Sequence, residues 1–207
     1  MHDQIARFVA LLLERNRGVN LTAARDEAAV AAHVCDALTL LPYVRSPLVD
    51  VGSGGGFPAI PLAIASGAQV TMVEATIKKA RFLQAAVDAL ELPATVLAER
   101  AETVGRDPRY RETFAAATAR AVGSLPTVLE LTVPLLAIGG IALLQRGMVD
   151  ERERQAAAGA ARVLGAEIGD EILLDGDRRI LVAIKREPTA TRFPRRAGVP
   201  ANRPLCA

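Results

Sequence analysis

The sequence contains few cysteines, few aromatic residues and no long apolar run. Two cysteines among 207 residues cannot form a disulfide framework, so we expect a reducing compartment. The longest apolar run near the N-terminus, residues 8–13, is followed by charged residues and is too short to span a membrane. Residues 1–20 also lack the basic segment and cleavage site of a signal peptide. These absences predict a cytoplasmic protein without a membrane segment.

Apolar residues and arginine are, by contrast, abundant. The chain is 51% hydrophobic and 23% charged, which allows a large core and excludes intrinsic disorder. The net charge is only +2, but residues 185–207 carry six basic side chains and one acidic side chain. These 23 residues have a charge of +5, and the preceding 184 residues have a charge of −3. We therefore predict that this segment contacts a phosphate-bearing partner.

Hydrophobic patterning predicts strands that alternate with helices. Strands are predicted over residues 48–51, 69–73, 94–98, 114–119, 140–144, 171–174 and 179–184. Helices are predicted over residues 4–15, 26–41, 58–66, 76–90, 125–137 and 150–164. A tight turn at 175–177 joins the last two strands, so one of them must run antiparallel to the rest. We expect an α/β fold: a doubly wound, mostly parallel sheet with one antiparallel strand and an N-terminal helical extension.

One domain accounts for the whole chain, since internal repeats and low-complexity linkers are missing from the sequence. We divide it into N-terminal helices over residues 1–44, a ligand-binding core over residues 45–186 and the basic tail over residues 187–207.

A glycine cluster follows the first predicted strand, in the segment Asp50-Val51-Gly52-Ser53-Gly54-Gly55-Gly56-Phe57. Glycines at this turn let the backbone approach a ligand closely, and the turn faces the crevice of a doubly wound sheet. Glu74, at the end of the next strand, can accept hydrogen bonds from both hydroxyls of a ribose. Together these features predict a nucleoside cofactor.

The spacing of the glycines distinguishes between cofactors. A dinucleotide fingerprint counted from Gly52 requires a glycine at position 57, where the chain has phenylalanine. The pattern Gly-x-Gly-x-Gly instead resembles the S-adenosylmethionine loop of class I, Rossmann-like methyltransferases. In that interpretation Asp50 positions the loop and the amino group of the methionine. A nicotinamide or flavin site, and a glycine turn without a ligand, are the alternatives.

The segments after the fourth and fifth strands constrain the methyl acceptor. Residues 118–124 lack the acidic or Asn residue followed by Pro-Pro and an aromatic residue that is usual in methyltransferases acting on exocyclic amines. Cys35 and Cys206 lie outside these segments, so no thiolate is placed for cytosine C5 methylation, and Cys35 is expected to be a small core residue. Guanine N7 has a free lone pair and needs no general base, so positioning alone can accelerate its methylation.

Several short motifs occur in order along the chain, namely Asn20-Leu21-Thr22, His33, Asp36, residues 51–58, Lys79, Arg81-Phe82-Leu83, Ala101-Glu102 and Arg120-Ala121. Together they resemble the RsmG family, also called glucose-inhibited division protein B, of bacterial 16S ribosomal RNA guanine-N7 methyltransferases. Residues 193–205 resemble the basic tail of Gram-positive members. The resemblance implies methylation of one guanine in the decoding region of 16S ribosomal RNA, presented by the small ribosomal subunit or an assembly intermediate.

The resemblance also suggests roles for individual residues. Contacts with S-adenosylmethionine are expected at Asp50, Gly52, Ser53, Gly54, Gly56, Phe57, Glu74, Ala101, Glu102 and Arg120. Catalytic roles are expected for Arg120, His33, Asp36 and Arg146, although the family often has Lys where this chain has Arg146. From the charge distribution, and not from the resemblance, RNA contacts are expected at Lys78, Lys79, Arg81, Arg192, Arg195 and Arg196. We expect a monomer without a metal ion; a small-molecule methyltransferase and a non-catalytic nucleotide-binding protein are the alternative functions.

Overall fold

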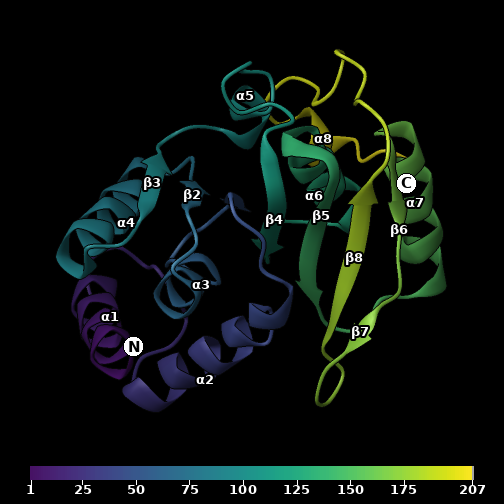
Figure 1. Cartoon of the computed structure of the whole chain (residues 1–207). Coiled ribbons are helices and arrows are strands. Elements are labelled where there is room, and N and C mark those ends of the chain that lie inside the picture. The colour runs from purple at the N-terminus through teal and green to yellow at the C-terminus, as the bar shows by residue number, and fades with distance from the viewer. Residues whose placement is uncertain (207) are drawn as a thin grey trace.

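The computed structural model describes residues 1–206, and an eight-stranded sheet forms its centre (Figure 1). The strands are β1 (Leu48–Val51), β2 (Val70–Val73), β3 (Ala94–Leu97), β4 (Phe114–Arg120), β5 (Leu136–Arg146), β6 (Ala166–Ile168), β7 (Ile172–Leu173) and β8 (Arg179–Lys185). Their order is β3-β2-β1-β4-β5-β8-β6, and β7 also pairs with β8. Strand β8 runs antiparallel to β1–β5. Strands β6 and β7 are antiparallel to β8 and therefore run in the same direction as β1–β5. The predicted mostly parallel sheet with one antiparallel strand is thus confirmed.

Helices cover both faces of the sheet (Figure 1). They are α1 (His2–Asn16), α2 (Glu27–Leu38), α3 (Ala59–Ser66), α4 (Ile77–Leu90), α5 (Ala101–Val104), α6 (Leu125–Thr132), α7 (Glu151–Val163) and α8 (Val199–Asn202), with short 3-10 turns η1 (Leu41–Tyr43) and η2 (Val133–Leu135). One apolar cluster lies under α1–α4 and the other under α5–α7. In β1, Leu48 belongs to the first cluster and Val49 and Val51 to the second, as alternation along a strand requires.

The sequence predictions were wrong at several boundaries. The helix predicted over residues 125–137 ends at Thr132, and Pro134 lies in η2 before β5 begins at Leu136. Proline has no N–H group for the helical ladder, so the chain changes conformation there. The short elements α5 and β6 were not predicted. The helix predicted over residues 26–41 ends at Leu38, and Cys35 on it is exposed rather than buried in the core.

The basic tail is docked against the protein. Phe193 is 5% exposed and belongs to the apolar cluster on the α5–α7 face. Arg111 donates to the carbonyl oxygen of Phe193 over 2.7 Å, and Arg106 Nε donates to that of Pro194 over 2.7 Å. Figure 1 shows the tail in yellow beside α5 and α6, and α8 is its one short helix within residues 1–206. In residues 1–206, none of the helices combines the length and the apolar composition needed to cross a membrane.

Candidate active site

The glycine loop follows β1 and has a left-handed backbone at three positions. The φ angles are +74° at Gly52, +54° at Gly54 and +89° at Gly56, values that favour glycine. A Cβ atom on Gly52 would lie 2.7 Å from Val122 Cγ2, whereas one on Gly54 would meet only a backbone oxygen at 3.7 Å. The space beside Gly54 is therefore open to a ligand.

Gly56 lies against α3, and its predicted contact with the cofactor stays a prediction. A Cβ atom there would lie 2.5 Å from Ile60 Cδ1, so glycine is required for packing against α3. The Ser53 hydroxyl donates to the carbonyl oxygen of Asp50 over 3.1 Å, which braces the turn from inside. Gly56 and Ser53 thus shape the loop.

Glu74, after β2, fixes the loop from its other side. Its carboxylate accepts hydrogen bonds from the backbone N–H of Gly54, over 2.9 Å, and of Thr76, over 2.7 Å. A carboxylate has about four lone-pair sites, so two remain for further donors. Glu74 can therefore hold the loop and accept the two hydroxyls of a ribose at the same time.

Asp50, at the end of β1, is a buried carboxyl group with one free oxygen. The Thr118 hydroxyl donates to Oδ1 over 2.7 Å, and Oδ2 has no hydrogen-bond partner within residues 1–206. Burial raises the pKa of Asp50 to about 6, against the opposing effect of the nearby hydroxyl groups of Ser53 and Thr118. An unsatisfied buried oxygen beside the glycine loop fits a cationic group such as the ammonium of S-adenosylmethionine.

A cavity of about 260 Å³ lies beside the loop on the α5–α7 face of the sheet. Four of the residues predicted to bind the cofactor line it, namely Gly52, Glu74, Ala101 and Glu102. The tail also contributes Gly198 and Ala201, which were not predicted from the sequence. We call this space the donor cavity. Asp50 and Gly54 are not among its lining residues. The backbone of Gly52 and the free lone pairs of the Glu74 carboxylate suit a nucleoside.

Phe57 does not line the donor cavity. Its ring packs edge-on against Phe8, with centroids 5.3 Å apart, and lies 5.6 Å from the ring of His33. The guanidinium carbon of Arg120 lies 5.0 Å from the Phe57 centroid, within the range of a cation–π contact. Phe57 therefore supports Arg120 and α2, and its contact with the cofactor stays a prediction.

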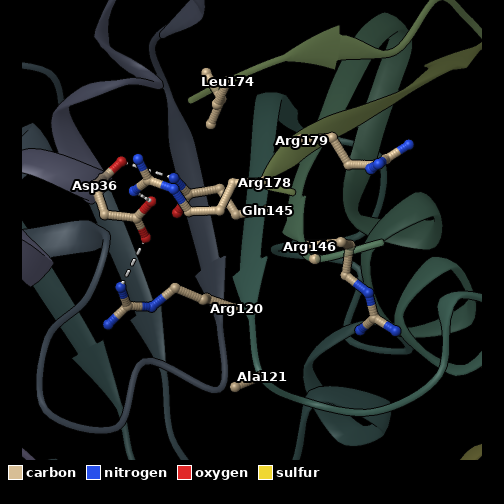
Figure 2. A pocket seen from close by; sticks show the side chains of 9 residues that line it. Asp36, Arg120, Ala121, Gln145, Arg146, Leu174, Arg178 and Arg179 are labelled. Carbon is tan, nitrogen blue, oxygen red and sulfur yellow. Dashed lines mark hydrogen bonds and ion pairs between the residues drawn. The ribbon is translucent and has the colours of Figure 1, made fainter. Parts of the chain in front are cut away.

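A second cavity, of about 320 Å³, opens where β4 and β5 end (Figure 2). Asp36, from α2, accepts from Arg120 over 3.1 Å and from Arg178 over 2.7 Å. Figure 2 shows these two arginines on either side of Asp36. Gln145, at the end of β5, donates to the Asp36 carbonyl oxygen over 2.7 Å. We call this space the arginine cavity, because Arg146 and Arg179 also line it.

The structure brings Arg120 and Asp36 together but turns Arg146 away from them. Arg146 forms an ion pair with Glu153 over 2.9 Å and donates to the carbonyl oxygen of Gly123 (Figure 2). Arg146 therefore braces the segment after β4. His33 is half-buried, and its burial, together with the charge of Arg120, lowers its pKa, against the opposing effect of Asp36. His33 thus favours the neutral form.

Arg178 is the main residue of the arginine cavity that was not predicted from the sequence. It lies 142 positions from Asp36 in the chain, just after the tight turn that joins β7 to β8. The turn was predicted, but the strand order that carries it to α2 was not. A basic residue after the hairpin turn was the only signal available.

The residues predicted to contact RNA fall into two groups. Lys78, Arg81, Arg192 and Arg196 are exposed and Lys79 is half-buried, so their charges are accessible. Arg195 differs, because its guanidinium is bound to the buried carboxylate of Glu130. Arg195 is therefore less free than the others to bind a phosphate, and its contact with RNA stays a prediction. Within residues 1–206, no cluster of three or more His, Cys, Asp or Glu side chains could hold a metal ion.

Comparison with known proteins places this geometry in a family. The model of the family described as "rRNA small subunit methyltransferase G" matches residues 1–172. The protein of that name from Chloroflexus aggregans is 43% identical, over 99% of this chain and 90% of its own length. The one from Leuconostoc citreum is 38% identical, over 98% and 90% respectively. A geranyl diphosphate methyltransferase solved with S-adenosylmethionine shares the fold, with a TM-score of 0.59 and 15% identity over 76% of this chain and 89% of its own.

Proposed function

Because this chain belongs to the rRNA small subunit methyltransferase G family, it is an S-adenosylmethionine-dependent methyltransferase of 16S ribosomal RNA, and we propose that its acceptor is N7 of one guanine in the decoding region. The observation that carries the proposal is the junction of the two cavities. Val122 lines the donor cavity, and its chain neighbour Ala121 lines the arginine cavity. A methyl donor and an anionic acceptor would therefore meet at the segment that follows β4.

The residues of the donor cavity suit binding and orientation of S-adenosylmethionine, which supplies an electrophilic methyl group. Glu74 would accept the ribose hydroxyls, Asp50 would hold the amino group, and Ala101 and Glu102 would lie beside the adenine. Gly52 and Gly54 would let the loop approach the rest of the molecule. Backbone groups and buried carboxylates move little, so the donor would be held in a defined orientation.

The arginine cavity suits the acceptor. Guanine N7 carries a lone pair and loses no proton on methylation, so this side requires no general base. Arg120 and Arg178 share the single carboxylate of Asp36, which leaves positive charge for an RNA phosphate or the O6 edge of guanine. We propose that Arg120 orients the base, that Asp36 and His33 position Arg120 from α2, and that Arg146 shapes the junction.

Recognition of the larger substrate would use the exposed basic residues. Lys78, Lys79 and Arg81 begin α4, close in the chain to Glu74, and Arg192 and Arg196 lie on the tail. Phosphate contacts of this kind fix register and carry little sequence information. We propose that selectivity comes from the way an assembled small subunit, or an assembly intermediate, presents its guanine to a monomeric enzyme in the cytoplasm.

The test is methylation of small subunits purified from a strain that lacks this modification. Labelled S-adenosylmethionine should transfer its methyl group, and borohydride and aniline should then cleave the RNA at a single guanine in the decoding region. Protein-free 16S ribosomal RNA should be a weaker substrate. Label at another base, or at an exocyclic amine, would contradict N7. Binding of the donor without transfer to any RNA would indicate a non-catalytic binding protein.

A further inference from the structure

The C-terminal segment passes across one side of the donor cavity. We propose that residues 193–202, here called the strap, form a wall of the S-adenosylmethionine site, and that Arg195 and Glu130 are positioning residues that hold this wall in place. The proposal rests on the proposed function of the donor cavity. It adds a role for a segment whose charge alone suggested RNA binding.

The anchor of the strap is a buried carboxylate on α6. Glu130 is 0% exposed, and all its contacts from the strap come from one residue. Arg195 donates its backbone N–H to Oε1 over 2.8 Å, its Nε to both oxygens over 2.9 and 3.0 Å, and its Nη2 to Oε2 over 2.6 Å. Arg195 Nη2 also donates to the carbonyl oxygen of Arg203 over 2.7 Å. A paired guanidinium of this kind makes a strong, directional contact that fixes the chain locally.

Two further contacts hold the strap at the edge of the cavity. Glu102 Oε1 accepts from the backbone N–H of Gly198 over 2.8 Å, and Gly198 has a φ angle of +82°. The Thr127 hydroxyl donates to the carbonyl oxygen of Pro200 over 2.9 Å. Glu102, Thr127 and Gly198 all line the donor cavity. Each of these two contacts therefore involves residues of the cavity wall.

The strap completes that wall with its own residues. Gly198 and Ala201 line the same cavity as Gly52 and Glu74, which follow β1 and β2. If the strap moved away, the donor would lose one side of its site, and Glu102 would lose the N–H group that it binds. Affinity for S-adenosylmethionine should therefore depend on Arg195, although this residue lies beyond β8, the last strand of the sheet.

The experiment compares Arg195→Ala with Arg203→Ala in the full-length protein. Both remove one positive charge from the tail, but only Arg195 contacts Glu130 through its side chain. Titration calorimetry with S-adenosylmethionine should show a dissociation constant at least about tenfold higher for Arg195→Ala. Arg203→Ala should match the wild type. In turnover on small subunits, the KM for S-adenosylmethionine should rise more than kcat falls.

A second variant keeps the test decisive if loss of the partner of buried Glu130 unfolds the protein. Ala201→Leu leaves the anchor intact and adds a side chain on the cavity wall, at an exposed position. It should weaken S-adenosylmethionine binding with an unchanged melting temperature. Wild-type affinity in a folded Ala201→Leu protein would overturn the strap as a wall of the site, whether or not Arg195→Ala folds. Wild-type affinity in a folded Arg195→Ala protein would overturn the positioning role of Arg195. Failure of the wild type itself to bind S-adenosylmethionine would instead overturn the proposed function.

Discussion

The donor cavity and the arginine cavity meet at Ala121 and Val122 but are built from different groups. Glycine backbone, main-chain N–H groups, buried carboxylates and a docked segment form the donor cavity. Long side chains from α2, β4, β5 and the β7–β8 hairpin form the arginine cavity, and ion pairs hold several of them. The carboxylates of the first set are buried, whereas the arginines of the second set are partly exposed.

The difference corresponds to the two proposed ligands. A small donor of constant shape is best bound by groups that are already in place before it arrives. A ribosomal substrate brings many phosphates, and these can compete with Asp36 for Arg120 and Arg178. Changes in the donor cavity should therefore strongly affect the dissociation constant for S-adenosylmethionine. Changes in the arginine cavity should affect turnover and RNA binding while donor affinity stays constant.

Gly52→Val should have the largest effect. The added Cβ atom would lie 2.7 Å from Val122 Cγ2, and the backbone has a φ angle of +74° that valine rarely adopts. Strain and overpacking together cost about 2–6 kcal/mol. We expect S-adenosylmethionine binding to fall at least about a hundredfold by calorimetry, with a lower melting temperature.

The matched control for Gly52→Val is Gly67→Ala, at the end of α3. Gly67 has a similar φ angle of +66°, but its added Cβ atom would meet no atom within 4 Å. It should lose some stability and keep its affinity for the donor. Equal loss of donor binding in both variants would mean that general strain, and not the shape of the donor cavity, controls binding.

Arg120→Ala should have the next largest effect, and on the other cavity. Loss of a charge-assisted contact costs about 1.5–3 kcal/mol, so methyl transfer to small subunits should fall about tenfold to a hundredfold. Donor affinity should change little, since Arg120 faces Asp36 and Phe57. Arg152→Ala, an exposed arginine on α7, serves as the control for loss of charge. A large loss of donor affinity in Arg120→Ala would place Arg120 in the donor cavity.

These two variants also separate what the sequence could and could not predict. The loop at Gly52 and the acid at Glu74 were predictable, because both follow buried strands of a parallel sheet and local sequence places them. Gly56 and Phe57 were assigned to the cofactor by the same motif, yet they pack against Ile60 and Phe8. A motif shows which residues lie in a loop, whereas the direction of each group depends on neighbouring elements.

The arginine residues show a larger difference between the sequence prediction and the structure. Charge counting treated Arg192, Arg195 and Arg196 alike, but one of them binds a glutamate buried on α6. Nothing in the local sequence relates Glu130 to Arg195, because their contact depends on the path of the tail across the molecule. Arg178 was missed for the same reason: only the strand order brings it to Asp36.

Asp50→Asn should have an intermediate effect, which depends on pH. Because burial raises the pKa of Asp50 to about 6, the folded free protein loses this negative charge as the pH falls through 6. Binding of the cationic donor to the wild type should therefore weaken about tenfold between pH 7 and pH 5. Asp50→Asn should bind more weakly than the wild type at pH 7 and show little of this dependence. A wild-type affinity that is constant from pH 7 to pH 5 would exclude Asp50 as the partner of the amino group.

Asp50 should also affect stability. As the pH rises, donor binding should strengthen, whereas the contribution of Asp50 to stability should be lost. The folded protein holds the Asp50 proton more tightly than the unfolded chain, whose ordinary pKa is 3.8. The contribution of this group is present below pH 3.8 and is lost as the pH rises through about 6, by about 3 kcal/mol at most. Urea unfolding should show that, between pH 3.8 and about 6, the free energy of unfolding of Asp50→Asn increases relative to that of the wild type. A difference that does not change with pH would show that Asp50 has an ordinary pKa.

Lys78→Ala should have the smallest effect, and it tests whether RNA recognition belongs mainly to the arginine cavity. Lys78 is exposed at the start of α4, after Glu74 and away from the arginines that line the second cavity. A single phosphate contact should weaken binding of small subunits by about 0.5–1 kcal/mol and lower the slope of log affinity against log salt by about one. Filter binding across a series of salt concentrations measures both quantities. A loss larger than that of Arg120→Ala would instead make α4 the main RNA-binding surface, and the two cavities would no longer divide donor from acceptor.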